Sequence, residues 1–330
     1  MWEILETIES EIVIRLVPGG KEEFFERLRK LGEKLSHISD KIEFTIGDEE
    51  LEIKPAMLLI GRNKRMIYSF YPEGKEKEPF LRNLVRVSSE SLEVTEKFAE
   101  RIKAIDKDIN IKIFITEFCP VCPGVVDRTG RLVSEHISLH VIDIPSFMEF
   151  EEKYEITATP TLIINDEAKL EGKLSLKEIL EWIEKVARGD KKELTANMLE
   201  KGMLENVIDI AGREGLEETL AELVSDSRMR VRMGAVAALE DLYSVDHEKI
   251  KKAIPILLEK LKIGEENIRG DVIYALGKIA DGDVIEELEE ELKNSEGNIK
   301  DALEDATSSI KKRNNSQSPP VKTGGLFCEE

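Results

Sequence analysis

The sequence contains no long apolar run, it is poor in cysteine and glutamine, and it has fewer basic than acidic residues. No stretch approaches the roughly 18 consecutive apolar residues of a membrane span, so we expect no membrane-spanning segment. Residues 1–6 are acidic and place no basic region before an apolar run, which argues against a secretory signal. We therefore expect a reducing, cytoplasmic setting, where structural disulfides are uncommon.

The shortage of basic residues argues against a nucleic-acid partner. The 330 residues include 48 Lys and Arg against 68 Asp and Glu, a formal net charge of −20. Binding to a phosphate backbone needs clustered basic side chains that release counterions, and this balance does not favour it. The many charges and the single glutamine, Gln317, are typical of proteins from thermophiles.

Length and apolar content predict two or three folded domains. A domain has roughly 150 residues, and an apolar fraction of 41% is enough to build hydrophobic cores. The excess of acid lies mainly at the C-terminal end. Residues 194–330 carry 18 basic and 29 acidic groups, a balance of −11. This charge either favours basic clients or keeps the protein in solution.

Strand and helix patterns alternate through residues 106–193. The β-branched alternation of residues 111–116 predicts a strand, and a turn with two cysteines and a helix to about residue 136 follow. Further strands are expected at 139–144, 161–164 and 169–173, and helices at 147–154 and 176–187. The order β-α-β-α-β-β-α predicts an α/β unit with a mixed sheet and flanking helices.

The first third of the chain, residues 1–105, repeats this order without any cysteine. Residues 55–60 parallel residues 160–164, each stretch opening on a proline, and Val17-Pro18-Gly19-Gly20 stands where the second copy has its cysteines. The other elements expected here are strands at 11–17, 41–46 and 66–71 and helices at 21–37 and 80–87. We therefore predict an internal duplication of about 100 residues.

Helical patterns take over after about residue 194. Three similar segments begin at Val231-Arg232, Ile268-Arg269 and Ile299-Lys300, 37 and 31 residues apart. Paired helices at this spacing predict an α-solenoid over residues 194–312, either a surface for a protein partner or a small stabilising appendage. Residues 313–330 are rich in Asn, Ser, Pro and Gly, and we expect them to be disordered.

Two of the three cysteines form a C-x-x-C pair between a predicted strand and a predicted helix. Cys119 would lie at the helix N-terminus, where the helix dipole stabilises a thiolate, and Cys122 about one turn further on the same face. A disulfide needs Cα atoms about 5.5 Å apart, which this spacing allows. Pro120 is compatible with a first helical turn. Such a pair can attack a substrate disulfide and then resolve the mixed disulfide.

Two other interpretations of this pair remain open: half of a metal site, and two inert core cysteines. Zinc needs four ligands, but there is no second C-x-x-C, and the four histidines are scattered at His37, His136, His140 and His247. We expect no metal or organic cofactor. Glu117 is either a proton shuttle beside Cys119 or a solvent-facing acid. We expect Cys328 to be a free, incidental thiol rather than a third redox partner.

The cysteine motif and the proline strand together resemble a known family. Cys119-Pro120-Val121-Cys122-Pro123, followed 37 residues after its second cysteine by Thr159-Pro160-Thr161, is similar to a thioredoxin/glutaredoxin-like domain. Over about residues 10–190, the doubled arrangement resembles the two-unit protein disulfide oxidoreductases of thermophilic microbes. Residues 67–74, with Pro79-Phe80, are similar to the hairpin of that family's first unit.

The resemblance implies roles for individual residues. Cys119 matches the nucleophile and Cys122 the resolving cysteine, with Pro120, Val121 and Pro123 completing the motif. Thr159 matches the residue whose backbone pairs with the substrate, and Pro160 the cis-proline that faces the active site; an ordinary edge-strand proline is the alternative.

The chain departs from this family in its first unit, which lacks the C-x-x-C pair that the family often has there. Pro55 would keep the cis-proline, but it faces no thiol. We therefore expect the first unit to be structural or client-binding, without a relay between two redox centres.

The C-terminal segments are similar to HEAT-like repeats, which present a surface to partners. The leading hypothesis is a cytoplasmic thiol–disulfide oxidoreductase that acts on a protein disulfide or dithiol client. Its helical repeats would recruit a protein partner, and an external reductase would supply electrons. The competing hypothesis is a non-enzymatic scaffold in which the C-x-x-C pair is a redox switch.

Overall fold

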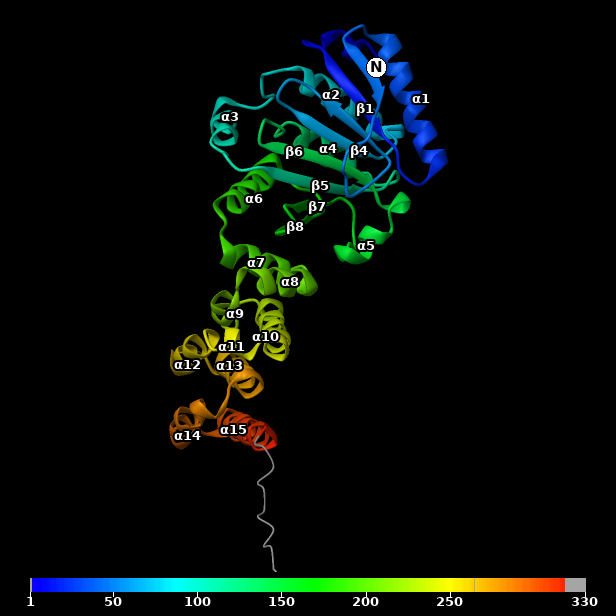
Figure 1. Ribbon diagram of the computed structural model, residues 1–330. Helices are drawn as coiled ribbons and strands as arrows, with labels where there is room; N and C mark the ends of the chain where they lie inside the picture. The colour runs from blue at the N-terminus through cyan, green and yellow to red at the C-terminus, as the bar shows by residue number, and fades with distance from the viewer. Residues whose placement is uncertain (1, 264, 318–330) are drawn as a thin grey trace, which may run out of the picture. The chain divides into compact units, whose positions relative to one another are not determined.

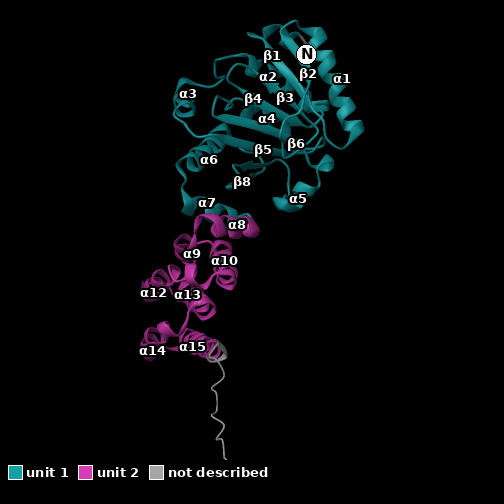
Figure 2. Cartoon of the chain, in the orientation of Figure 1, with its two compact units in different colours: residues 1–201 teal, residues 202–330 magenta. Residues whose placement is uncertain are grey.

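The chain forms two compact units, residues 1–201 and residues 202–330, coloured separately in Figure 2. The structure is a computed structural model that describes residues 2–263 and 265–317. The first unit is α/β with a mixed sheet, and the second is all helical, as the sequence predicted (Figure 1).

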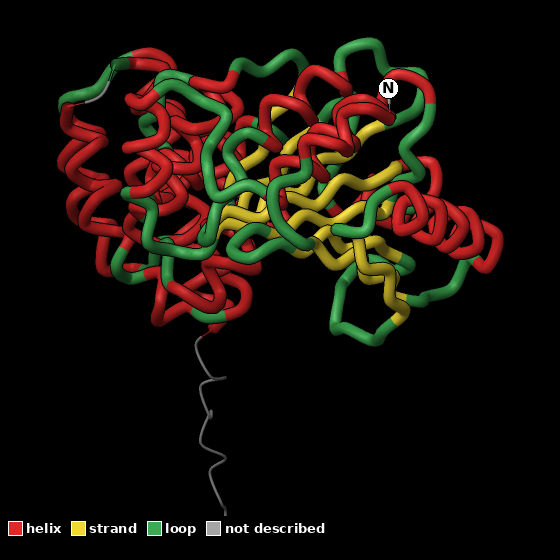
Figure 3. The backbone as a smooth tube through the Cα atoms, turned by 90° about the horizontal axis from the view of Figure 1, so that it is seen from above, coloured by secondary structure: helices red, strands yellow, loops and turns green. Residues whose placement is uncertain are grey.

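A single eight-stranded sheet runs through the first unit, in the order β2-β1-β3-β4-β6-β5-β7-β8, and its strands lie side by side in Figure 3. The two predicted copies therefore do not form separate bodies, because the parallel pairing of β4 with β6 joins them edge to edge. The strands are β1 Ile12–Val17, β2 Ile42–Ile46, β3 Ala56–Ile60, β4 Arg65–Ser69, β5 Ile109–Ile115, β6 Ile137–Asp143, β7 Thr161–Ile164 and β8 Ala168–Glu171.

Four helices cover one face of this sheet. Alternate strand residues such as Ile14, Tyr68 and Ile113 point into a continuous core beneath them, and each fully buried aliphatic side chain contributes about 1.5–3 kcal/mol. The helices are α1 Glu22–Ile38, α2 Lys77–Ser88, α4 Cys122–Gly130 and α6 Leu176–Arg188, with α3 Glu96–Lys103, α5 Glu149–Lys153 and the short turns η1 Trp2–Thr7, η2 Gly74–Glu76 and η3 Ile144–Ser146 between elements. The second copy thus has the predicted order β5-α4-β6-α5-β7-β8-α6.

The loop with the cysteines and its counterpart in the first copy lie at the same end of the strands. Strands β1, β4, β6 and β5 run in one direction, so their C-terminal ends lie at this end. Strands β3 and β7 run in the opposite direction and begin there, directly after Pro55 and Pro160. The loop with the cysteines and its cysteine-free counterpart therefore lie at the same end of the strands.

Helix α7, Lys191–Glu200, belongs to the first unit and covers the edge strand β8. The side-chain amide of Asn197 accepts a hydrogen bond from the backbone N–H of Lys169 at 2.8 Å and donates to its carbonyl at 3.2 Å. This pairing satisfies backbone groups that an edge strand would otherwise expose. The boundary between the two units accordingly lies at residues 201 and 202, after α7, rather than at the expected 193 and 194.

The second unit is a stack of helices in which α10 packs on α13 and α13 on α15. Its elements are α8 Leu204–Glu214, α9 Glu217–Leu223, α10 Met229–Val245, α11 His247–Ile250, α12 Ala253–Ile263, α13 Glu266–Ile279, η4 Gly282–Val284, α14 Ile285–Lys293 and α15 Gly297–Gln317.

The arginines of the first two repeat segments make equivalent contacts. Arg232 donates to Asp271 at 2.6 Å and to the carbonyl of Asp226, and Arg269 donates to Glu291 at 2.6 Å and to the carbonyl of Leu261. Each arginine thus bonds to a carbonyl before its own helix and to a carboxylate further along the stack. Assignment to HEAT-like repeats stays a prediction.

Helix α15 extends further than the sequence indicated. Residues 313–317, expected to be disordered, continue this helix to Gln317. Arg313 donates to the carbonyl of Gly277 at 3.1 Å and to that of Ala280, which holds this end of the helix against α13. Residues 318–330, including Cys328, lie outside the described residues. Among the helices of the described ranges, none is both long and apolar enough to cross a bilayer.

Candidate active site

A disulfide joins Cys119, in the loop after β5, to Cys122, the first residue of α4, with Cα atoms 5.5 Å apart. The two cysteines differ in accessibility, since Cys119 is 8% exposed and Cys122 is fully buried. Both sulfurs therefore belong to the buried part of the unit, and of the two residues only Cys119 keeps some exposed surface.

Helix α4 begins three residues later than the sequence indicated, at Cys122 rather than at Cys119, and it ends at Gly130 rather than near residue 136. Cys119 lies just ahead of the helix, and its Sγ accepts a hydrogen bond from the backbone N–H of Cys122 at 3.1 Å. This N–H is one of the unpaired donors at a helix start, where the dipole also favours negative charge. Pro123 fits the first turn because that turn needs no N–H from it.

The loop before β7 faces the disulfide. The Thr159–Pro160 peptide bond is cis, Pro160 is buried, and the carbonyl oxygen of Thr159 lies 3.4 Å from Cys119 Sγ. Antiparallel pairing of β7 with β5, with Phe114 opposite Thr161, fixes this loop beside the cysteine turn. The structure thus brings Thr159 and Pro160 to the cysteine pair; their substrate-binding role stays a prediction.

The rim of the site is partly apolar. Pro120 is exposed and Val121 and Pro123 are half-buried, while Phe118, directly before Cys119, is 89% exposed. The sequence reasoning missed Phe118, although an aromatic residue beside a C-x-x-C motif was a visible signal. Glu117 is exposed.

Glu76 is a second residue that the sequence reasoning missed. It is 3% exposed, and neither of its carboxylate oxygens has a hydrogen-bond partner among the described residues. Burial raises the pKa of this carboxyl to about 7. Glu76 ends η2, which packs against α4, the helix that begins with Cys122. Nothing in the charged sequence around it, residues 73–78, distinguished Glu76 from its solvated neighbours.

The cysteine-free copy keeps the backbone arrangement of the site but holds another part of the protein. Its Lys54–Pro55 bond is also cis, and a Cβ at Gly19 would lie 2.4 Å from Lys54 Cβ, so only glycine permits this approach. Lys21, at the start of α1, donates to the carbonyl of Ser146 and lies 4.2 Å from the centre of the Phe147 ring. The loop after β6 is therefore anchored at the counterpart of the redox site.

The described residues offer little to a metal ion. Within residues 2–263 and 265–317, no three His, Cys, Asp or Glu side chains gather as a metal site. The sulfurs of Cys119 and Cys122 are bonded to each other. His140 bonds instead to Ser69 Oγ at 2.9 Å, between β4 and β6.

Comparison with known proteins agrees with this geometry. Residues 109–184 match the thioredoxin-domain family. The match begins at β5 and ends within α6, so it covers the second copy and both cysteines. This part of the chain therefore has a thioredoxin-like fold, whose cysteine pair supports thiol–disulfide exchange.

Two curated proteins extend the similarity. The chain is 26% identical over 180 residues to an NADH dehydrogenase of Bacillus subtilis, which covers 53% of this chain and 35% of that protein. It is 23% identical over 267 residues to the F component of the alkyl hydroperoxide reductase of Pseudomonas putida, which covers 76% of this chain and 49% of that protein. The chain thus spans about a third to a half of the length of these relatives.

A solved structure shares the fold of the first unit. The F component of the alkyl hydroperoxide reductase of Enterococcus faecalis aligns with a TM-score of 0.51 at 20% identity, covering 55% of this chain and 94% of that one. The expected α/β architecture is thereby confirmed.

Proposed function

We propose that this protein is a thiol–disulfide oxidoreductase that acts on disulfides of protein clients through Cys119. The observation that carries the proposal is the asymmetry of the pair. Cys119 keeps 8% of its surface exposed and lies 3.4 Å from the Thr159 carbonyl, whereas Cys122 is fully buried. An attacking thiol must be reached by the substrate, and a resolving thiol must be kept from it.

In the reducing direction, the Cys119 thiolate attacks one sulfur of the client disulfide. A Cys119–client bond forms, and the client's other sulfur leaves as a thiolate. The Cys122 thiolate then attacks Cys119 Sγ, which restores the 119–122 disulfide and releases the second client sulfur. Two electrons pass from the protein to the client, and the protein ends in the oxidised state of this structure. In reverse, the same steps oxidise a dithiol.

Glu76 would receive the proton that the Cys122 thiol loses before its attack. A carboxyl whose pKa is about 7 accepts and returns a proton near neutral pH, and η2 places it against the helix of Cys122. With no hydrogen-bond partner among the described residues, its oxygens are available for this transfer.

A protein client would bind along the Thr159 backbone and over Phe118. Thr159 precedes the cis bond and presents its carbonyl toward Cys119, so an extended client segment can pair with its backbone there. Phe118 offers an exposed aromatic side chain next to the reacting sulfur, which favours a client with apolar residues beside its cysteine.

A separate reductase would return electrons to the pair. The names of the two relatives, an NADH dehydrogenase and a component of a reductase, support a reductant drawn from such enzymes, and the chain spans only part of each. The protein would work in a reducing, cytoplasmic setting. Its helical unit, with HEAT-like repeats, would recruit a protein partner.

Turnover tests the proposal directly. The protein should reduce a small disulfide-linked protein, such as insulin, with dithiothreitol as the electron source, and Cys119→Ser should abolish this activity. Cys328→Ser is the matched control and should leave it unchanged. Equal rates for wild type and Cys119→Ser would contradict the proposal.

A further inference from the structure

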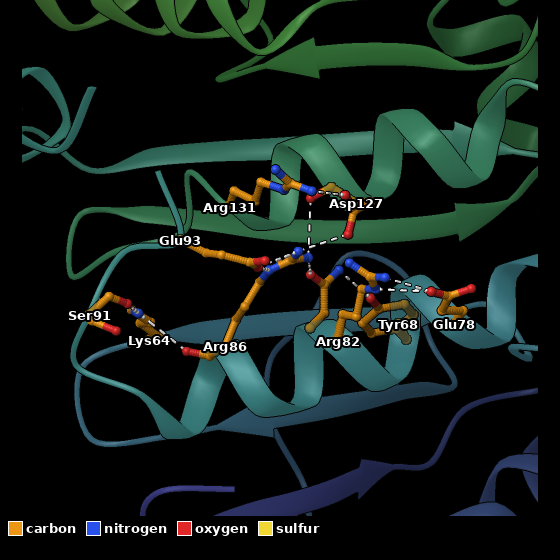
Figure 4. A network of polar contacts seen from close by, with 10 residues as sticks. Lys64, Tyr68, Glu78, Arg82, Arg86, Ser91, Glu93, Asp127 and Arg131 are labelled. Atoms are coloured by element: carbon orange, nitrogen blue, oxygen red, sulfur yellow. Dashed lines mark hydrogen bonds and ion pairs between the residues drawn. The ribbon is translucent and has the colours of Figure 1, made fainter. Parts of the chain in front are cut away.

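Arg86, on α2, forms a network of polar contacts between the cysteine-free copy and the redox helix α4 (Figure 4). The residue is 6% exposed. Nε donates to the Glu93 carboxylate, and Nη1 donates to Asn83 Oδ1 and to the Asp127 carbonyl. Nη2 donates to Asp127 Oδ1 at 2.8 Å and forms an ion pair with Glu93 at 2.6 Å. Four of the five N–H groups of the guanidinium thus donate a hydrogen bond, and the ion pair with Glu93 adds to them.

Two of these contacts fall on the C-terminal end of α4. The Asp127 carbonyl is among the last four of the helix, which have no regular partner within it. The N–H of Arg131 turns back to Arg128 instead, so the Asp127 carbonyl is left for Arg86 at 3.2 Å. A cation at this end also suits the helix dipole.

The surrounding residues hold this arrangement rigidly. Asp127 Oδ2 accepts from Arg131 at 2.7 Å, and the two guanidinium groups, against the effect of burial, lower the pKa of Asp127. Asn83 donates to the Tyr68 hydroxyl at 2.9 Å. A Cβ at Gly130 would lie 1.9 Å from Asn83 Oδ1, so the glycine lets α2 approach α4 closely.

We propose that Arg86 is a positioning residue for the redox pair: it holds the C-terminal end of α4 so that the N–H of Cys122, at the other end, stays aimed at Cys119 Sγ. The cysteine-free copy would then serve the chemistry by fixing the redox helix. This inference rests on the site of the proposed function, and it assigns a task to the copy that has no cysteines.

Thiolate formation at Cys119 tests the inference without any turnover. In the reduced protein, the rate of iodoacetamide alkylation at Cys119, followed by mass spectrometry, is measured against pH. Arg86→Lys keeps the charge but loses the planar five-donor fork, and Asp127→Asn keeps the shape but loses the charge. We expect both variants to raise the pH midpoint of alkylation by about half a pH unit. At pH values below the midpoint, alkylation of Cys119 should then be about threefold slower than in the wild type.

The two variants separate positioning from simple electrostatics. Charge alone predicts no shift for Arg86→Lys and a downward shift for Asp127→Asn, because a negative charge is removed. Positioning predicts an upward shift for both, with the double variant shifting no more than the larger single change. Arg82→Lys is the matched control, since Arg82 lies on the same helix but pairs only with Glu78, at 2.7 Å, among the residues drawn in Figure 4.

A wild-type midpoint in both variants, with only a lower urea midpoint for unfolding, would overturn the inference and leave Arg86 as a brace between helices. A downward shift in Asp127→Asn would overturn it as well. If Arg86→Lys does not fold, Asp127→Asn alone decides. Failure of the proposed oxidoreductase function would appear separately, as absent insulin reduction by the wild type.

Discussion

The backbone N–H of Cys122 donates a hydrogen bond to Cys119 Sγ across 3.1 Å, so the first turn of α4 points at the more accessible sulfur of the pair. A helix start stabilises negative charge on such an acceptor, both through its free N–H groups and through its dipole. The buried Cys122 has no comparable access to solvent. This contact supports the different roles that we propose for the two cysteines.

The first prediction concerns the order in which the thiols react. After reduction, iodoacetamide at neutral pH should modify Cys119 at least about tenfold faster than Cys122, because burial removes Cys122 from the reagent. Mass spectrometry of the native protein measures both rates, and unfolding in urea should make them equal. Faster modification of Cys122 in the folded protein would contradict the assignment of roles.

Glu76→Gln should slow resolution without stopping attack. The amide cannot accept a proton from the Cys122 thiol, so client release should fall about tenfold or more, while formation of the mixed disulfide continues. Quenched-flow sampling of the Cys119–client adduct measures the two steps. Glu78→Gln, a change at an exposed carboxylate of the same segment, is the control. An unchanged release rate would exclude Glu76 as the proton acceptor.

The same carboxyl predicts a pH dependence of stability. Its folded-state pKa of about 7 lies above the ordinary value of 4.5, so between these limits the native state keeps a proton that the unfolded state has lost. Stability contributed by this group therefore falls as pH rises through that window, by about 2 kcal/mol between pH 5 and pH 8. Urea unfolding should therefore show that the stability of Glu76→Gln, relative to that of the wild type, is higher at pH 8 than at pH 5. A constant difference would contradict burial of the carboxyl in its neutral form.

Phe118→Ser should weaken binding of protein clients while sparing the chemistry. Phe118 is 89% exposed beside Cys119, and loss of a bound aromatic side chain costs about tenfold in affinity. We expect KM for insulin to rise by about this factor and the rate with a small aromatic disulfide to stay unchanged. Ile46→Ser, at an exposed apolar residue on β2, should leave both constants as they are. An unchanged KM in Phe118→Ser would show that Phe118 does not take part in client binding.

Asn197→Leu should destabilise the first unit by about 1–3 kcal/mol, because it leaves the buried N–H and carbonyl of Lys169 unpaired. Urea unfolding measures the loss. Asn294→Ala, which removes an exposed side-chain bond to the Glu290 carbonyl, is the control and should change stability little. Equal unfolding midpoints for Asn197→Leu and wild type would show that α7 does not secure β8.

Local patterns in the sequence were enough to locate most of the α/β elements. The alternation of residues 111–116 and the apolar spacing of residues 21–37 predicted β5 and α1 to within two residues, because each depends on its own side-chain periodicity. The C-x-x-C spacing likewise indicated that Cys119 and Cys122 can form a disulfide, since this bond follows from nearby chain geometry.

Contacts between distant segments were not predictable in this way. The parallel pairing of β4 with β6 joins residues about 70 positions apart in the chain. The sequence of neither strand indicates which strand it will pair with. Glu76 and Arg86 look like ordinary charges of an amphipathic region in the sequence, and they are buried by contacts between elements that are distant in the chain. The predicted solenoid over residues 194–312 takes in most of α7, because Asn197 gives no local sign of its bond to β8.

Trapping of the mixed disulfide tests the central claim most directly. In a Cys328→Ser background, Cys122→Ser is reduced and mixed with a disulfide-linked client, and the adduct is mapped by mass spectrometry. We predict a stable client disulfide on Cys119, because the thiol that would release it is gone. Cys119→Ser in the same background should give almost none. Equal adduct yields in the two variants, or no adduct in Cys122→Ser, would contradict the account.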